Sequence, residues 1–364
     1  MARTSAAALV AGVVAVVSVA GTALAEGTWG SEEFPAKPDL VSLVTTVSSG
    51  GGETWAFGTH NRPNAPGSLT TQAFHREEGG RWVEVPVPNI GQVMSSAVTG
   101  PDDAWVVSEF SKVHSGATMH WDGTAWTEAP LEVPDAPRVS PSDVLAVGSD
   151  VWAIGSAYRD GEDPLSRSFA ARWVDGAWQG VALPQEADQQ RFTSIGGAAP
   201  DDLWMAGTTG ERPQQVVTMH WDGAQWSQVP VPALDTGESD YLTVHGVAAF
   251  RPDDVWLSAT QSPYDPQGKS RPVLLHWDGA AWTEQQLPVP VQRLGELVQA
   301  GGALWNLGPD ALLRYDGSTW QQVDGPQEGA ITHGAELPDG RLVGIGSGGE
   351  DPLRPQPFAV VQNP

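Results

Sequence analysis

The amino-acid sequence predicts an all-β fold, a seven-bladed β-propeller built of four-stranded blades. Two repeated motifs and the period that they share lead to this prediction. The first is a hairpin motif, H-W-D-G-x-x-W, and the second is an upstream turn motif, P-D-D followed by an apolar residue and Trp. Repeats of roughly 40–50 residues made of short strands and turns are typical of propeller blades.

The hairpin motif occurs in full at 119–130, 219–230 and 275–286, and in weaker form from Arg172 and Arg314. Asp-Gly between two apolar runs is the strongest short-range signal of a β-hairpin. The two Trp of each full copy, such as Trp121 and Trp126, lie five positions apart. We therefore expect them to face each other across the hairpin and to stabilise it as an aromatic pair.

The turn motif ends at Trp105, Trp204 and Trp256 in its full copies and at Trp55, Trp152 and Trp305 in degenerate ones. Successive Trp of this series lie 47 to 52 residues apart. The two independent motifs keep the same phase over nearly the whole chain, so we expect one ring of blades, occupying residues 26–364 as a single domain.

The repeats divide the chain into seven blades, with six as the alternative count. The expected blades are 39–88, 90–134, 137–184, 190–232, 240–290, 291–324 and 328–362. The last blade offers only three strands. The segment 28–35 resembles the second strand of a hairpin without its partner, so we expect this N-terminal strand to complete the last blade and close the ring.

Residues 1–25 have the features of an export signal. Arg3 gives a positive start, 6–20 is an apolar run of small residues, and Ala23-Leu24-Ala25 is a cleavage pattern. The run is too short for a convincing membrane span. We therefore expect a secreted, extracellular protein that begins at Glu26 and does not insert into a membrane.

The composition narrows the classes of partner. The chain has 44 acidic residues against 19 Lys and Arg, and its formal net charge is −25. This balance argues against nucleic acid and anionic membrane surfaces as partners. The absence of Cys excludes a disulfide framework and thiolate chemistry.

The His and Asp of the repeats first suggest metal sites, but a structural role explains them better. His120, His220 and His276 fall in different blades, so equivalent positions cannot converge on one ion. We expect the Asp of each Asp-Gly turn to bind backbone amides, and the P-D-D pairs to act in the same way. No cofactor is expected; a weak calcium site among these carboxylates is the alternative.

Antiparallel pairing places the turns of both motifs on one face of the ring, which we call the regular face. The connections between strands 2 and 3 and between blades lie on the opposite, irregular face, where binding residues are expected. Aromatic rings beside polar and charged groups suit a sugar, whose C–H face stacks while its hydroxyls form hydrogen bonds. The candidate ligand-binding residues are Phe110, Lys112, Tyr158, Arg159, Asp160, Arg167, Tyr264, Asp265, Lys269 and Arg271.

The paired motifs resemble the repeats of secreted β-propeller proteins of actinobacteria and myxobacteria, which are grouped with kelch, galactose-oxidase-like and Asp-box propellers. The resemblance covers residues 28–362. The chain departs from the Asp-box pattern, and no Cys matches the copper site of galactose oxidase, so no catalytic residues carry over. Export, single-propeller size and the absence of a recognised catalytic motif also fit the propeller lectin subunit of streptomycete umbrella toxin particles.

Three functions follow as hypotheses. The leading one is a non-enzymatic lectin-like protein that binds cell-surface carbohydrate through the irregular face, as a monomer or as the targeting subunit of a secreted hetero-complex. The second is a protein-interaction scaffold with a secreted protein partner. The third is a propeller lyase or hydrolase. Its candidate acid–base groups are Asp160, Glu162, Asp163, Asp265 and His245.

Overall fold

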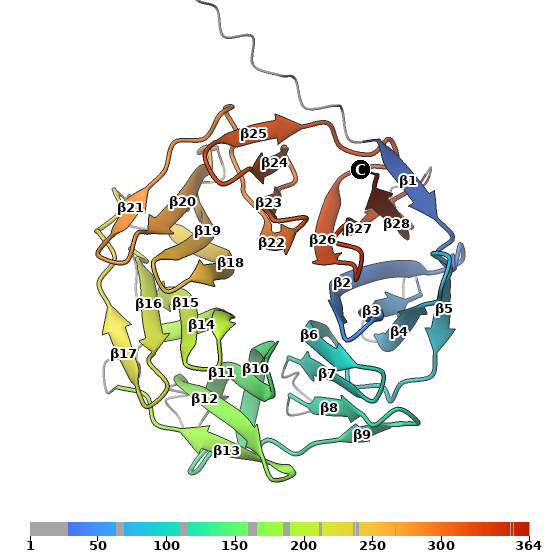
Figure 1. Cartoon of the computed structure of the whole chain (residues 1–364), viewed down its shortest axis with the longest axis horizontal. Helices are drawn as coiled ribbons and strands as arrows, with labels where there is room; N and C mark the ends of the chain where they lie inside the picture. Colours follow the sequence, from blue (N-terminus) through green and yellow to red (C-terminus); the bar gives the residue numbers. More distant parts are fainter. Residues whose placement is uncertain are drawn as a thin grey trace, which may run out of the picture.

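A computed structural model describes residues 28–62, 69–109, 116–158, 166–184, 190–210, 213–235, 237, 240–265, 267–349, 351 and 353–363. Seven four-stranded antiparallel sheets stand around a central channel (Figure 1). The predicted seven-bladed propeller is thereby confirmed, and the alternative count of six is wrong. Within these ranges, no helix has the length and apolar character needed to cross a membrane.

Each blade runs outward from the channel in chain order. Blade 1 consists of β2 (Val41–Gly50), β3 (Glu53–Asn61), β4 (Thr70–Arg76) and β5 (Trp82–Val85). Blade 2 consists of β6 (Val93–Gly100), β7 (Asp103–Ser108), β8 (Thr118–Trp121) and β9 (Trp126–Glu128). Blade 3 consists of β10 (Arg138–Val147), β11 (Asp150–Tyr158), β12 (Ser166–Val174) and β13 (Ala177–Val181).

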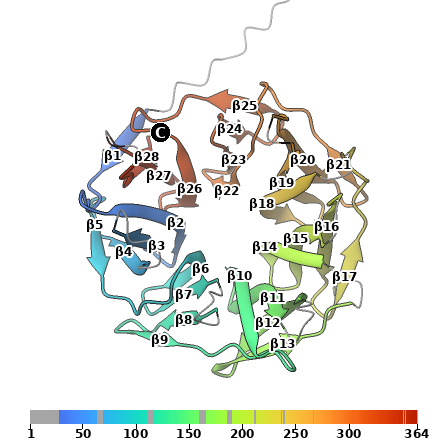
Figure 2. The same ribbon diagram turned by 180° about the vertical axis from the view of Figure 1, so that it is seen from behind.

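The second half of the ring repeats this order, and Figure 2 shows the same succession from behind. Blade 4 consists of β14 (Gln190–Ala199), β15 (Asp202–Thr209), β16 (Val216–Trp221) and β17 (Trp226–Val229). Blade 5 consists of β18 (Tyr241–Arg251), β19 (Asp254–Ser262), β20 (Arg271–Trp277) and β21 (Trp282–Glu284). Blade 6 consists of β22 (Glu296–Ala300), β23 (Ala303–Leu307), β24 (Leu312–Tyr315) and β25 (Trp320–Val323).

Blade 7 joins the two ends of the chain. Its inner strands are β26 (Ile331–Glu336), β27 (Leu342–Gly348) and β28 (Gln356–Gln362), and its outer strand is β1 (Trp29–Glu32). Strand β1 pairs antiparallel with β28, with Trp29 opposite Gln362 and Glu32 opposite Ala359. The predicted closure by the N-terminal strand is confirmed, and it covers the edge of β28 that would otherwise be unpaired.

An ion pair anchors this closing strand to the first blade. Arg76 Nη2 on β4 lies 2.5 Å from Glu32 Oε1 on β1, and Arg76 Nε also donates to Glu32 at 2.9 Å. The indole N–H of Trp82 donates to Glu32 Oε2 at 2.9 Å. The Glu32 side chain is only 9% exposed, so blades 7 and 1 are joined by a nearly buried carboxylate with three donors.

The hairpin motif folds as expected. In blade 2, Trp121 pairs directly with Trp126 across the turn, with ring centroids 5.6 Å apart. Asp122 Oδ1 accepts hydrogen bonds from the backbone N–H groups of Thr124 and Ala125, both at 2.9 Å. Gly123 takes the left-handed conformation, with φ at 87°, which glycine adopts without strain.

The Trp of the turn motif binds adjacent blades together, which the sequence analysis did not anticipate. Trp55 of blade 1 packs edge-to-face against Trp126 of blade 2, at 5.6 Å and 89°. The same T-shaped contact joins Trp152 to Trp226 and Trp204 to Trp282, at 5.7 and 5.5 Å. The hairpin of each of these blades therefore receives a buried aromatic ring from the blade before it, which sets the positive edge of one ring against the face of another.

The second Asp of the turn motif binds side chains and not the backbone amides that we expected. In blade 4, Asp202 Oδ1 accepts hydrogen bonds from His220 Nε2 at 2.8 Å and from the Trp204 indole at 3.3 Å. The imidazole also stacks on Trp204, with centroids 4.6 Å apart. Blades 2 and 5 repeat this Asp–His–Trp unit with Asp103 and Asp254. The structural interpretation of the repeated His is confirmed.

Arginine replaces His in two of the degenerate repeats. In blade 3, Arg172 donates to Asp150 Oδ1 at 2.6 Å and lies 5.9 Å from the centroid of Trp152. In blade 6, Arg314 lies 5.6 Å from the centroid of Trp305. In both blades the guanidinium group lies over the Trp ring, where the imidazole stacks in blades 2, 4 and 5. A cation over an aromatic face is attractive, so the packing is kept although the side chain differs.

We predict that Glu32→Gln lowers the free energy of unfolding by about 2–4 kcal/mol, because Arg76 loses its charge partner in a largely buried position. The matched control is Glu77→Gln. The Glu77–Arg81 pair is mostly exposed, so this change should cost no more than about 0.5 kcal/mol. Urea unfolding of both variants checks the prediction, and equal small losses would contradict it.

We predict that Asp202→Ala destabilises the protein by about 1–3 kcal/mol, since it leaves the buried Trp204 indole and the partly buried His220 imidazole without an acceptor. The neighbouring Asp201 is exposed, so Asp201→Ala serves as the control with an expected change of about 0.5 kcal/mol or less. Thermal denaturation distinguishes the two; equal melting temperatures would show that Asp202 has no such role.

Candidate functional site

A β-bulge interrupts the inner strand of six of the seven blades. The pairing of each inner strand with its neighbour shifts by one residue between positions such as Val44 and Thr46 or Phe192 and Ser194. The residues left out of register are Thr45, Met94, Ser142, Thr193, His245 and Thr332. A bulge re-aims side chains and increases the local twist, and here all six residues line the central channel.

Hydroxyl groups at the bulges connect one blade to the next. Thr45 Oγ1 donates to the Val93 carbonyl of blade 2, and Ser142 Oγ donates to the Phe192 carbonyl of blade 4, both at 2.9 Å. Ser194 Oγ accepts the backbone N–H of Val247 in blade 5 at 3.0 Å. These bonds satisfy backbone groups that the bulges leave unpaired, so the channel wall is held at a fixed geometry.

The channel contains a cavity of about 580 Å³. Its walls are formed by the first halves of the inner strands, with Ser262, Arg293 and Pro309 nearer the blade ends. Inner strands begin at the irregular face, so the cavity occupies that half of the channel. Its volume suits a small polar ligand or one part of a larger one.

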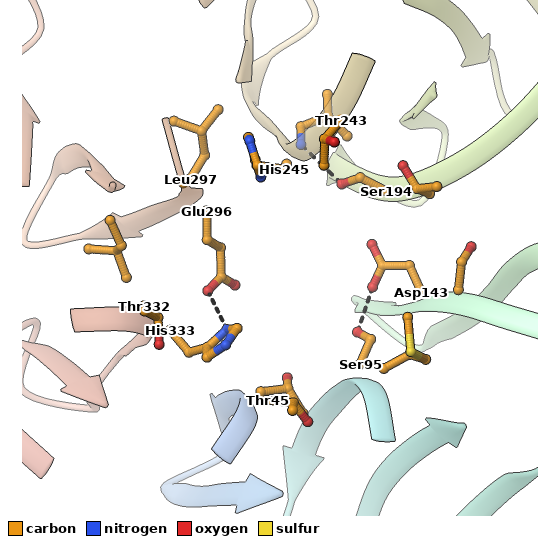
Figure 3. Close-up of a pocket in the computed structure, with 18 of the residues that line it drawn as sticks. Thr45, Ser95, Asp143, Ser194, Thr243, His245, Glu296, Leu297, Thr332 and His333 are labelled. Carbon is orange, nitrogen blue, oxygen red and sulfur yellow. Dashed lines mark hydrogen bonds and ion pairs between the residues drawn. The ribbon is translucent and has the colours of Figure 1, made fainter. Parts of the chain in front are cut away.

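Asp143 is the most strongly perturbed ionisable group in the cavity. Its carboxylate accepts hydrogen bonds from Ser95 Oγ at 2.5 Å and from the backbone N–H groups of Val144 and Ile195 at 2.8 Å (Figure 3). Burial raises its pKa to about 6, and the charge of Glu296 adds to this effect against the hydrogen bonds. Asp143 thus joins blades 2, 3 and 4 and presents a carboxyl group to the channel.

Glu296 of blade 6 and His333 of blade 7 form a second ionisable pair. His333 Nδ1 lies 3.3 Å from Glu296 Oε2, and Figure 3 shows both side chains directed into the channel. His245 lies in the same wall, with Nε2 2.9 Å from Thr260 Oγ1, and burial lowers its pKa below the ordinary value. Arg293 pairs with Asp310 at 3.0 Å, so its charge is already matched.

A pair of tyrosines lies beside the mouth of this cavity. Tyr241 and Tyr264 of blade 5 stack with centroids 6.1 Å apart and an interplanar angle of 27°. Tyr241 pairs with Ser262 across the sheet, and it precedes the cavity-lining Thr243 by two residues. Two residues of strand span about 7 Å, so the aromatic pair adjoins the cavity wall. Tyr264 is 64% exposed.

The structure divides the candidate residues that it describes into two groups. Tyr264, Asp265, Lys269 and Arg271 belong to one connection of blade 5, whereas Tyr158 and Arg167 belong to blade 3, and blade 4 separates them. They therefore lie in separate parts of the irregular face, in the two blades to which the sequence analysis assigned them.

Three of these residues are engaged in the structure of the loops themselves. Arg167 donates to the Pro134 carbonyl. Asp265 caps its own turn by accepting the Gln267 N–H at 2.9 Å. Arg271 binds Gln261 at 3.1 Å and also Glu284. Tyr264, which stacks on Tyr241, and Lys269 are exposed, whereas Tyr158 is half-buried.

The other candidates lie outside the described residues. These are Phe110, Lys112, Arg159 and Asp160, together with the acid–base candidates Glu162 and Asp163 and the export signal at 1–25. Of the acid–base candidates in the described ranges, His245 reaches the channel, whereas Asp265 does not line the cavity.

Sequence reasoning missed Asp143, Glu296, His333 and the bulge residues. One signal could have located the bulges: Thr45, Ser142 and His245 stand 10 or 11 positions before the repeat Trp of their blades. Asp143 and Glu296 fall in no motif, because each occurs in only one blade.

A second hollow, of about 740 Å³, lies on the regular face at the seam of blades 7 and 1. Both of its Arg are already paired within the fold, Arg76 with Glu32 and Arg341 with Asp339. Among the side chains that the structure describes, no group of three or more His, Asp and Glu is arranged to hold a metal ion. The channel cavity is therefore the better candidate for a ligand site.

No protein-family model matches the chain, and a search of curated proteins finds no match. Its structure is similar to that of YCF48 bound to a D1 peptide, with a TM-score of 0.56 at 15% identity, covering 92% of this chain and 97% of that one. A protein of unknown function from Dyadobacter fermentans gives a TM-score of 0.52 at 9% identity, covering 92% and 98%. The SapL1 lectin in complex with α-methyl fucoside gives 0.47 at 14% identity, covering 80% and 96%. At these identities the similarities concern the fold alone.

We predict that ionisation of Asp143 costs stability. Its carboxyl ionises near pH 3.8 in an unfolded chain and near pH 6 in the fold. The contribution of this group to the free energy of unfolding is therefore most favourable below pH 3.8, and it falls by up to about 3 kcal/mol as the pH rises to about 6. Urea unfolding of the wild type and of Asp143→Asn between about pH 4 and 7.5 measures this. The wild type should weaken relative to the non-titrating variant as the pH rises; a gap independent of pH would contradict the prediction.

Proposed function

We propose that this chain is an exported, non-catalytic binding protein that recognises carbohydrate at the irregular-face mouth of its channel. The observation that carries the proposal is the stacked pair Tyr241–Tyr264 beside a polar cavity of about 580 Å³. An exposed aromatic ring offers a flat apolar face to the C–H groups of a sugar, and the hydroxyl-lined wall offers partners to its hydroxyl groups.

The chemistry of the cavity wall supports a hydroxyl-rich ligand. Three different blades line it with hydroxyl groups, those of Thr243, Thr260, Ser262, Ser95 and Thr332. Each hydroxyl both donates and accepts hydrogen bonds, so the wall can match sugar hydroxyl groups in either role. A wall of this kind, beside one aromatic pair, favours recognition of a polar ring over an apolar ligand.

A binding role fits the cavity better than catalysis. Asp143 accepts hydrogen bonds from three donors, two of which belong to adjacent blades, and His245 faces Thr260. Both groups contact a hydroxyl, Ser95 for Asp143 and Thr260 for His245, but Thr260 Oγ1 also accepts the Leu294 N–H, and among the described residues no third side chain orients His245 as a base. Screening of the purified protein against polysaccharides, with Asp143→Asn as a blank, would reveal turnover if this assignment is wrong.

We predict that Tyr264→Ala weakens glycan binding about tenfold, whereas Tyr264→Phe, which keeps the ring, retains it. Tyr264 is exposed, so neither change should alter the free energy of unfolding by more than about 0.5 kcal/mol. A glycan array that includes bacterial wall polysaccharides identifies the ligand, and calorimetry then compares the variants. Undiminished binding by the folded Ala variant would remove the tyrosine pair from the site.

A protein partner is the second candidate function, and one observation favours it. The exposed large apolar residues of the described chain are Leu43, Leu69, Tyr264 and Leu353, and all four lie on or next to irregular-face connections. Exposed apolar side chains gathered on one face mark an interaction surface. Co-purification of a stoichiometric partner that Leu353→Asp abolishes would support this function; a protein that binds glycan and elutes as a free monomer would count against it.

A further inference from the structure

The charges that face the channel cavity are not balanced. Asp143 and Glu296 contribute two carboxyl groups from opposite parts of the ring (Figure 3). The single Arg of the wall, Arg293, is already paired with Asp310. His245 is biased toward its neutral form by burial. Of the basic side chains that line the cavity, this leaves His333, which lies against Glu296.

Glu296 has more acceptor capacity than its described surroundings use. An ionised carboxylate has about four lone-pair sites, and the described contact of its side chain is the 3.3 Å approach of His333 to Oε2. Its side chain is 35% exposed, toward the cavity that it lines. A donor brought by a ligand therefore has room to bind Glu296 without breaking a hydrogen bond of the fold.

We propose that the ligand carries a positively charged amino group that enters the channel between Glu296 and Asp143, so that the recognised carbohydrate is an amino sugar and not its N-acetylated form. This inference rests on the proposed function and specifies its ligand class. An ammonium group has three donors and no acceptor, so it matches carboxylates and serine or threonine hydroxyls. An acetamide in the same place would leave the carboxylates without a counter-charge.

The surroundings of the cavity favour a sugar amine over the lysine of a peptide. A sugar ring that stacks on Tyr264 lies close to the cavity wall formed by Thr243 and Ser262, because the stacked Tyr241 stands opposite Ser262 in the sheet. An amino group attached directly to that ring, or to the next ring of an oligomer, can point into the cavity while neighbouring hydroxyls meet the wall. A lysine side chain would bring the charge but no hydroxyls to match this surface.

The proposal also fixes the direction of the pH dependence. The groups that face Asp143 are Ser95 of blade 2, the Ile195 N–H of blade 4 and, across the cavity, Glu296, His333, His245 and Arg293. As the pH falls through about 6, Asp143 gains a proton and loses its attraction for a cation. Affinity for an amino sugar should therefore decrease on acidification, whereas affinity for a neutral sugar should change little.

The test compares oligomers of glucosamine with N-acetylglucosamine oligomers of equal length by calorimetry at about pH 6.5, above the pKa of about 6 of Asp143. We expect the glucosamine oligomer to bind about tenfold more tightly, and Glu296→Gln to remove this preference. The control is Glu128→Gln, which removes one charge from the exposed outer strand β9 and should preserve the preference.

Each of the other outcomes contradicts either the amino-group inference or the proposed function. Equal affinity of the two oligomers would overturn the amino-group inference and leave carbohydrate binding standing. Binding of neither oligomer, in a protein that also fails on the glycan array, would overturn the proposed function. Binding of oligolysine without glucosamine would replace the sugar with a basic peptide. The comparison of oligomers on the wild type needs no variant, so it stands even where Glu296→Gln does not fold.

Discussion

The contact on which this ring depends is the insertion of one blade's aromatic side chain into the hairpin of the next. Trp55, Trp152 and Trp204 are buried against hairpin Trp of blades 2, 4 and 5. Each such contact buries large apolar area on both partners, and edge-to-face geometry adds to it. A blade without its neighbour would expose these rings, so the blades are stable as a closed set.

The seam shows what happens where the repeat is incomplete. Blade 7 brings no Trp in its second strand; instead Phe34 packs on Phe74 and Trp82 of blade 1, at 4.7 and 5.3 Å. Glu32 adds the ion pair with Arg76. A hydrophobic contact alone has little directionality, whereas a carboxylate that receives three donors fixes the register of a short strand. The closing strand is thus held by polar geometry as well as by packing.

The two faces of the ring differ in how far their polar side chains are engaged by the protein itself. On the regular face, the charged groups of the motifs form hydrogen bonds within the protein: Asp122 accepts from backbone amides of its turn, and Asp202 accepts from His220 and Trp204. On the irregular face and in its half of the channel, side chains such as Glu296 and Tyr264 retain accessible surface. A group already satisfied by the fold has little interaction free energy left for a ligand, so recognition is expected where the repeats are broken.

The sequence by itself determined the propeller fold, the strand order, the closing strand and the Asp-Gly turns, because each depends on local periodicity and turn chemistry that repeat along the chain. It favoured seven blades, and the structure excluded the alternative of six. It also pointed to Tyr264 and to the irregular face. It could not place Asp143 beside Ser95 and Ile195, or oppose Glu296 to Asp143, because these residues are separated by about one to three blades and meet only when the ring closes. The residues that build the scaffold recur from blade to blade, whereas cavity residues such as Asp143 and Glu296 each occur in a single blade. Only the tertiary structure brings such residues from different blades together.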